Sequence, residues 1–182
     1  MNKVKCLIYC TKDKNNQLYR YYGNKYDVLE SKQDTMPQPD FFMNGKIVAQ
    51  FDCEKVEKFD VPYPAYFWEV KDKLEYITNN SCLSLMSLHH YLKNDSGYAI
   101  HVSNLEIFDE PIDLEKGGIY KDYNYKIKMV TKAPQNMQYV NDLFGREYVL
   151  ISIRPEWVCK ILNGEKTIEV RKQVLNCLKE LI

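Results

Sequence analysis

The stretch ISIRPEWVCKILNGEKTIEVRK, residues 151–172, decides the expected fold of this chain. Its apolar opening continues a run from Tyr148 that predicts a buried strand. Pro155 suits the first turn of a following helix, where its missing N–H costs nothing, and Gly164 stands where a helix end needs a positive φ. Residues 166–171 have strand character again, so the stretch predicts a strand, a short helix and a second strand.

The second of these strands carries three charged side chains, Lys166, Glu169 and Arg171. Strand alternation places Glu169 and Arg171 on one face, whereas Lys166 lies on the other unless the turn after Gly164 swings it round. The arginine can grip a phosphate or a base edge, the lysine can supply a point charge or act as a base, and the glutamate can accept from an exocyclic amine. The alternative is that Glu169 and Arg171 only form an ion pair at a rim, which costs little to hold.

Upstream of this stretch, hydrophobic periodicity predicts further strands and helices. Apolar or alternating runs predict strands over 4–9, 46–56 and 98–108, and apolar residues at intervals of three and four predict helices over 67–77 and 83–93. Residues 11–40 are expected to be mostly loop, with a short hairpin around Leu18 to Tyr22, and 115–127 are weakly patterned. The total is about six strands and three or four short helices, which predicts one α+β domain with a closed or nearly closed barrel.

The composition is that of an ordinary globular protein. Of the 182 residues, 25 are basic and 25 acidic, so no global positive field indicates nucleic-acid binding, and any such contact would need a local patch or pocket. Six scattered cysteines without a C-x-x-C pair argue against a disulfide scaffold, and with no leader before them we expect a reducing cytoplasm. No apolar run approaches the ~20 residues of a membrane helix. His89 and His90 are adjacent on a predicted helix, so their side chains diverge by roughly 100° and do not form a pair of metal ligands. No other spacing in the sequence indicates a metal, and no cofactor is expected.

The pattern G-x-K-x-x-E-x-R, formed by Gly164, Lys166, Glu169 and Arg171, resembles the opening motif of the ASCH domain, a PUA-like β-barrel associated with RNA or modified nucleosides. The resemblance implies an RNA-binding or nucleotide-binding pocket lined by Lys166, Glu169 and Arg171. Thr11, Lys12 and His101 are further candidates from neighbouring strands, although a single strand histidine is more often structural than a general base.

Other segments resemble later strands of the same family, but the order is changed. The opening motif closes this chain, and the segments that resemble the later strands precede it, at 7–12, 45–53, 97–109 and 130–139. The chain therefore resembles a circularly permuted ASCH domain, which a compact domain with neighbouring termini tolerates.

This order divides the single expected domain, residues 1–182, into a barrel body (1–140), a connector (141–147), the permuted strand-helix-strand block (148–172) and a tail (173–182). Residues 1–140 alone would leave an exposed sheet edge, which the block would cover. The block can instead complete a neighbouring molecule in a swapped homodimer, or the gene can be a remnant of two copies.

The family also includes amidohydrolases that act on a modified nucleoside, with a motif that resembles K-T-I-T. Here the corresponding residues are Lys166-Thr-Ile-Glu169, so a glutamate stands where the nucleophilic threonine is expected. The sequence thus favours an RNA-binding or nucleotide-binding domain. Two alternatives are a hydrolase, with Lys166 as base and Glu169 as its partner, and an interaction protein without a ligand.

Overall fold

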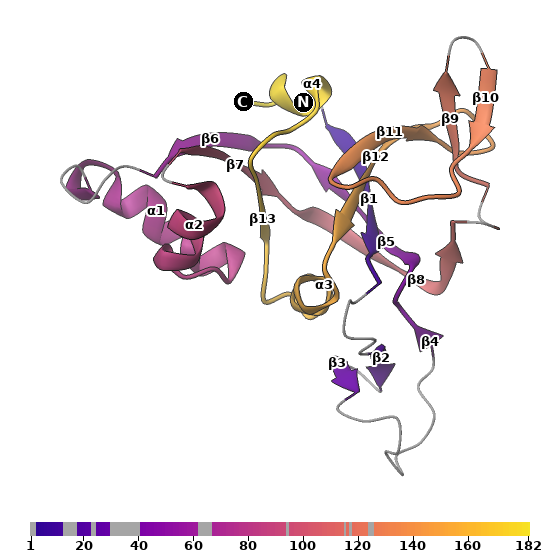
Figure 1. Cartoon of the computed structure of the whole chain (residues 1–182), viewed down its shortest axis with the longest axis horizontal. Coiled ribbons are helices and arrows are strands. Elements are labelled where there is room, and N and C mark those ends of the chain that lie inside the picture. The colour runs from indigo at the N-terminus through magenta and orange to yellow at the C-terminus, as the bar shows by residue number, and fades with distance from the viewer. Residues whose placement is uncertain are drawn as a thin grey trace.

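A computed structural model describes residues 3–12, 18–22, 25–29, 41–61, 67–93, 95–114, 116, 118–123 and 126–182 of the chain. These residues form an α+β fold with one seven-stranded mixed sheet, two three-stranded sheets and four helices. In Figure 1 the seven-stranded sheet occupies the centre and right of the view, and a three-stranded sheet extends from it toward α1 and α2 at the left.

The seven-stranded sheet forms the body of the molecule. Its central strand β12 pairs in parallel with β1 on one side and antiparallel with β11 on the other, so the C-terminal block completes the sheet of its own chain. The strands, in spatial order, are β10 (Lys126–Met129), β9 (Tyr120–Tyr123), β11 (Met137–Asn141), β12 (Glu147–Ile153), β1 (Val4–Cys10), β5 (Lys46–Cys53) and β8 (Ser103–Asp113).

Two smaller sheets accompany it. One has β7 (Ser96–His101) at its centre, flanked by β13 (Ile168–Arg171) and β6 (Val56–Asp60), all antiparallel. The other joins β2 (Leu18–Tyr22) to β3 (Lys25–Leu29) and β4 (Phe41–Phe42). The antiparallel pairing of β2 with β3 confirms the hairpin expected there, whereas 13–17 and 30–40 of the predicted loop lie outside the described residues.

Four helices pack against these sheets, α1 (Phe67–Ser81), α2 (Leu85–Leu92), α3 (Pro155–Leu162) and α4 (Asn176–Lys179). The apolar stripes of α1 and α2 pack on one face of the β6-β7-β13 sheet through buried Leu74, Ile77, Leu88 and Leu92. Helices α3 and α4 pack against the seven-stranded sheet, where Val158, Ile161 and Leu178 join its largest core cluster. No helix in the described part of the chain is both long and apolar enough to cross a bilayer.

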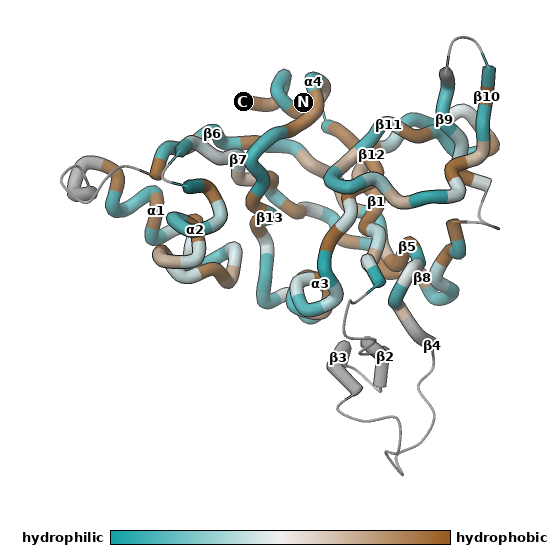
Figure 2. The backbone as a smooth tube through the Cα atoms, in the orientation of Figure 1, coloured by the Kyte–Doolittle hydropathy of each residue, from teal (hydrophilic) through white to brown (hydrophobic). Residues whose placement is uncertain are grey.

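Strand β1 explains why the apolar run at the start of the chain is continuous rather than alternating. Cys6 and Ile8 point into the core beneath α3, and Leu7 and Tyr9 point into a separate core on the other face of the sheet. A strand buried on both faces needs apolar residues at every position. Figure 2 shows hydrophobic residues gathered where β1, β5 and β12 meet, whereas β10 at the edge is mainly hydrophilic.

The strand-helix-strand prediction for the C-terminal block is confirmed. Arg154 precedes α3, Pro155 occupies its first turn, and Gly164 has φ +75° just beyond its end. The tail, which has apolar residues at helical spacing, contains α4 and buries Val174 and Leu178. Local signals in the sequence were therefore sufficient for this segment.

The predicted closed barrel is wrong. Strands β8 and β10 are the two edges of the seven-stranded sheet and do not meet among the described strands. The strand expected over 98–108 is divided at Val102, whose N–H donates to Thr167 O at 2.9 Å, and the chain passes there from β7 in the small sheet to β8 in the large one. The estimate of about six strands is also too low, because the described residues form thirteen strands, and two of them, the antiparallel pair β9 and β10, overlap the weakly patterned segment 115–127.

One buried carboxylate, that of Asp52 on β5, lies outside the candidate pocket. Its Oδ2 accepts hydrogen bonds from Lys3 Nζ at 2.8 Å and Asn104 Nδ2 at 3.1 Å, and Lys5 Nζ lies 3.4 Å from Oδ1. The bond from Lys3, then that from Asn104, lower the pKa of Asp52 to about 2 although burial opposes them. The folded state therefore binds this proton less readily than the unfolded chain.

We expect this carboxylate to contribute to loss of stability in acid. The ionised Asp52 stabilises the folded state at any pH above about 4, the pKa of this carboxyl group in the unfolded chain. As the pH falls from about 4 toward 2, the unfolded chain takes up the proton before the folded protein does, and the stabilisation is lost. In Asp52→Asn the free energy of unfolding should vary less with pH in this range, by about 1 kcal/mol, because the lysines that face Asp52 are screened by water. Urea unfolding at several pH values measures both slopes, and identical slopes would contradict the assignment.

Candidate functional site

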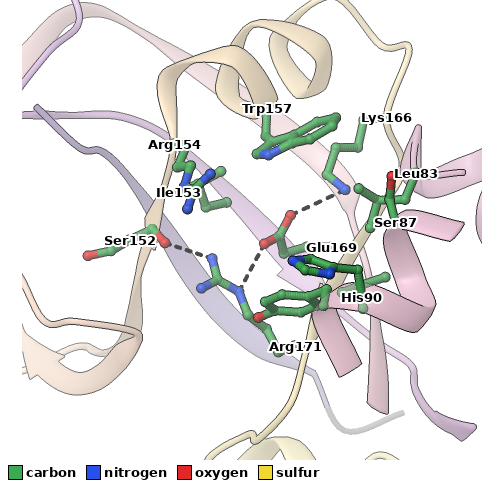
Figure 3. A pocket seen from close by; sticks show the side chains of 12 residues that line it. Leu83, Ser87, His90, Ser152, Ile153, Arg154, Trp157, Lys166, Glu169 and Arg171 are labelled. Atoms are coloured by element: carbon green, nitrogen blue, oxygen red, sulfur yellow. Dashed lines mark hydrogen bonds and ion pairs between the residues drawn. The ribbon is translucent and has the colours of Figure 1, made fainter. Parts of the chain in front are cut away.

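A cavity of about 540 Å³ opens where α2, α3, β12 and β13 converge. The neighbouring sheets provide its floor and the two helices its walls, so segments far apart in the sequence meet there. Figure 3 shows the side chains that point into it. The lining residues are Leu83, Ser87, His90 and Tyr91 on and before α2, Ser152, Ile153 and Arg154 at the end of β12, Trp157 on α3, and Lys166, Glu169, Val170 and Arg171 on and before β13.

The floor of this cavity is a row of three buried charges. Lys166 Nζ lies 3.3 Å from Glu169 Oε2, and Arg171 Nε lies 2.9 Å from Glu169 Oε1. Glu169 and Arg171 share one face of β13, opposite Ile100 and Tyr98 of β7. Lys166 precedes β13, and the turn after α3 brings its ammonium to the same carboxylate. The carboxylate is thus held between two cations.

Backbone and amide oxygens hold the two cations in place. Lys166 Nζ donates to Ser81 O at 2.8 Å and to Ile168 O at 2.7 Å. Arg171 Nη1 donates to Asn136 Oδ1 at 2.9 Å, and Nη2 donates to Ser152 O at 2.7 Å. Buried cations need partners of this kind because leaving one unpaired costs several kcal/mol.

The charge row is not fully satisfied. Arg171 Nε is buried and makes no hydrogen bond, although it lies 2.9 Å from Glu169 Oε1, so its N–H is not aligned with that oxygen. Among the described residues the row carries one net positive charge, since two cations face one carboxylate.

Burial also affects the protonation of Lys166. Desolvation lowers the pKa of this ammonium, and the neighbouring Glu169 carboxylate opposes the shift. Three acceptors surround Nζ, namely Ser81 O, Ile168 O and Glu169 Oε2, and they match the three N–H groups of an ammonium, whereas a neutral amine has only two. A role as general base would require Lys166 to give up one of these contacts. The arrangement therefore favours a positioning role for Lys166 over a catalytic one.

Aromatic side chains form the walls above the charges. In Figure 3 Trp157 and His90 lie on opposite sides of the Glu169 carboxylate. Lys166 Nζ lies 5.5 Å from the centre of the Trp157 ring, and Lys160 Nζ lies 5.6 Å from it. Trp157 packs partly against the main core cluster and also lines the cavity.

Three of the six predicted site residues do not line the cavity. His101 lies opposite Ile168 on the other face of the small sheet from Glu169, where its Nε2 lies 2.8 Å from Glu57 Oε1. The Thr11 N–H donates to Ile153 O and extends the pairing of β1 with β12, and Lys12 is exposed beside Gly45. The geometry thus separates these three residues from Lys166, Glu169 and Arg171.

The sequence reasoning missed the contribution of α2. Ser87, His90 and Tyr91 are spaced by three and four residues, so they share one face of α2 that differs from its buried stripe. This second periodic face was the available signal. Asn136, which orients Arg171, lies before β11, and no local pattern in the sequence marked it.

No protein-family model matches the sequence, no curated protein matches it, and no solved structure matches the fold. The function must therefore be argued from the geometry of the cavity. In the described part of the chain, no group of three or more His, Cys, Asp or Glu side chains is arranged to hold a metal ion.

Proposed function

We propose that this cavity binds the base of a nucleotide, either free or within RNA. The observation that carries the proposal is the Glu169 carboxylate, held between Lys166 and Arg171 at the floor and flanked by Trp157 and His90. A planar heterocycle stacks on aromatic rings, and a fixed carboxylate accepts hydrogen bonds from its N–H edge. The fixed carboxylate thus sets the orientation of the base, and the aromatic rings provide the area on which the base stacks.

The mouth of the cavity is suited to a phosphate. Arg154 lines it and is largely exposed, and its guanidinium lies 3.9 Å from the carboxylate of the partly exposed Glu156. Lys172 Nζ lies 5.2 Å from the centre of the Tyr91 ring, and Tyr91 also lines the cavity. The net charge of the whole chain is zero, so it gives no general attraction for phosphate. Arg154 and Lys172 instead provide a local positive region at the pocket.

Binding is favoured over hydrolysis by the state of Lys166. The hydrolase alternative needs this lysine as a base, yet its ammonium donates to two carbonyl oxygens and lies beside Glu169. Glu169 is in turn held between two cations, which fix its orientation. These two residues are better arranged to orient a ligand than to transfer protons.

We also propose that the chain is a permuted ASCH-like domain. The permuted order requires the C-terminal block to lie beside the first strand of the chain, and the parallel pairing of β12 with β1 supports this. The open sheet differs from the barrel of that family. The proposal therefore rests on the order of the segments and on the Gly164, Lys166, Glu169 and Arg171 pattern.

The proposal predicts that Trp157→Ala weakens nucleotide binding by about fivefold to 150-fold, because stacking of a base on an aromatic ring contributes about 1–3 kcal/mol. Titration calorimetry with the four ribonucleoside 5′-monophosphates and a short mixed-sequence single-stranded RNA measures the loss. The control is Phe144→Ala, which removes an aromatic ring that is 83% exposed and does not line this cavity. Equal affinity in both variants would place the ligand elsewhere.

A further inference from the structure

The hydrogen-bonding pattern of the cavity floor goes one step beyond nucleotide binding. Each oxygen of Glu169 has one cation close to it, Lys166 at Oε2 and Arg171 at Oε1. A carboxylate oxygen has two lone-pair positions, so each oxygen can accept one further hydrogen bond. Two acceptors that lie side by side match a ligand edge with two adjacent N–H donors.

The two cations, Lys166 and Arg171, have few N–H donors left to bind a ligand. Two N–H groups of Lys166 and both terminal nitrogens of Arg171 donate within the protein, and Arg171 Nε is buried. Their main effect is to fix the orientation of the Glu169 carboxylate from both sides. The floor therefore presents acceptors to a ring rather than a mixture of acceptors and donors.

We propose that the cavity selects guanine among the nucleobases, an inference that rests on the proposed nucleotide binding. Guanine carries N1–H and a 2-amino group side by side, so both oxygens of Glu169 gain a donor. Adenine and cytosine place a ring acceptor beside their amino group, and uracil places its one N–H between two carbonyl oxygens. Each of these three would turn a lone pair toward a carboxylate oxygen, which is unfavourable.

The stacking contacts and the size of the cavity agree with this assignment. About 540 Å³ is within the range of small-molecule sites and accommodates a purine with its sugar. Trp157 and His90 lie on either side of Glu169, where they can flank the plane of a ring whose donor edge points to the floor. The exposed Arg154 at the mouth can then reach a phosphate on the sugar.

Calorimetry of the unaltered protein with GMP, AMP, CMP, UMP and IMP tests the inference. GMP should bind at least roughly tenfold more tightly than AMP, CMP and UMP, since hydrogen bonds to a charged acceptor discriminate strongly. IMP lacks only the 2-amino group, so it should bind roughly tenfold or more weakly than GMP. Equal binding of GMP and IMP would overturn the two-donor pairing.

Glu169→Gln provides a second arm, because an amide presents one acceptor and one donor. This variant should lose the preference for GMP and gain relative affinity for AMP or CMP, whose edges offer one donor beside one acceptor. If AMP, CMP or UMP binds the unaltered protein more tightly than GMP, and Trp157→Ala weakens that binding, guanine selection is wrong and nucleotide binding stands. If neither these five nucleotides nor the short single-stranded RNA binds, both proposals fail.

Discussion

A chain that ends at Asn141 should not fold. This truncation removes β12 from the middle of the seven-stranded sheet, and with it the buried side chains of Val149, Leu150, Ile151 and Ile153. Burial of each such side chain contributes about 1.5–3 kcal/mol, whereas a whole domain is stable by only about 5–15 kcal/mol. Strands β1 and β11 would also each expose an unpaired edge.

Circular dichroism and light scattering measure this outcome. The truncated chain should lack a cooperative unfolding transition or aggregate, and the full-length chain should be folded. A control that ends at Lys172 keeps β12, α3 and β13 but loses α4, so its loss of stability should be smaller. A folded, monomeric truncation would mean that the C-terminal block is an appendage, and a stable full-length dimer would favour the swapped arrangement.

The second large effect is expected at Glu169. Replacing it by alanine leaves Lys166 and Arg171 buried without their carboxylate, at Nζ and Nε respectively. Breaking a buried ion pair by removing one partner destabilises a protein by about 3–5 kcal/mol, because an uncompensated charge remains in a poorly solvated position. Urea unfolding should therefore show a marked fall in the midpoint for Glu169→Ala.

The matched control for this variant is Glu156→Ala. Glu156 also faces an arginine, Arg154, but the two side chains are 42% and 78% exposed and lie 3.9 Å apart. Exposed pairs of this kind contribute less than about 1 kcal/mol. Equal and small losses in the two glutamate variants would show that the charge row is solvated, and the account of a fixed carboxylate would then fail.

The sequence predicted best what is encoded locally. Pro155 begins α3, Gly164 ends it, and the apolar residues of β12 are contiguous, so strand, helix and second strand lie where the periodicity placed them. The grouping of Glu169 with Arg171 followed from strand alternation in the same way. These features depend on interactions between residues that are close together in the chain.

Long-range features were not predictable in this way. Closure of the barrel depends on whether β8 meets another edge, and no local signal reports that the chain leaves the small sheet at Val102. The wall of the cavity formed by His90 depends on the packing of α2 near β13, about 80 residues away. His101 was a reasonable candidate by residue type, but its strand register points it to Glu57 instead.

The most direct test of the central claim uses Trp157 in the cavity wall, one of two tryptophans in the chain. Indole N–H signals in ¹⁵N-labelled protein, assigned with Trp157→Phe, are followed while each of the four nucleoside monophosphates is added. At least one nucleotide should shift the Trp157 signal in a saturable way. A Trp157 signal that stays unchanged at millimolar concentrations of all four would contradict this claim.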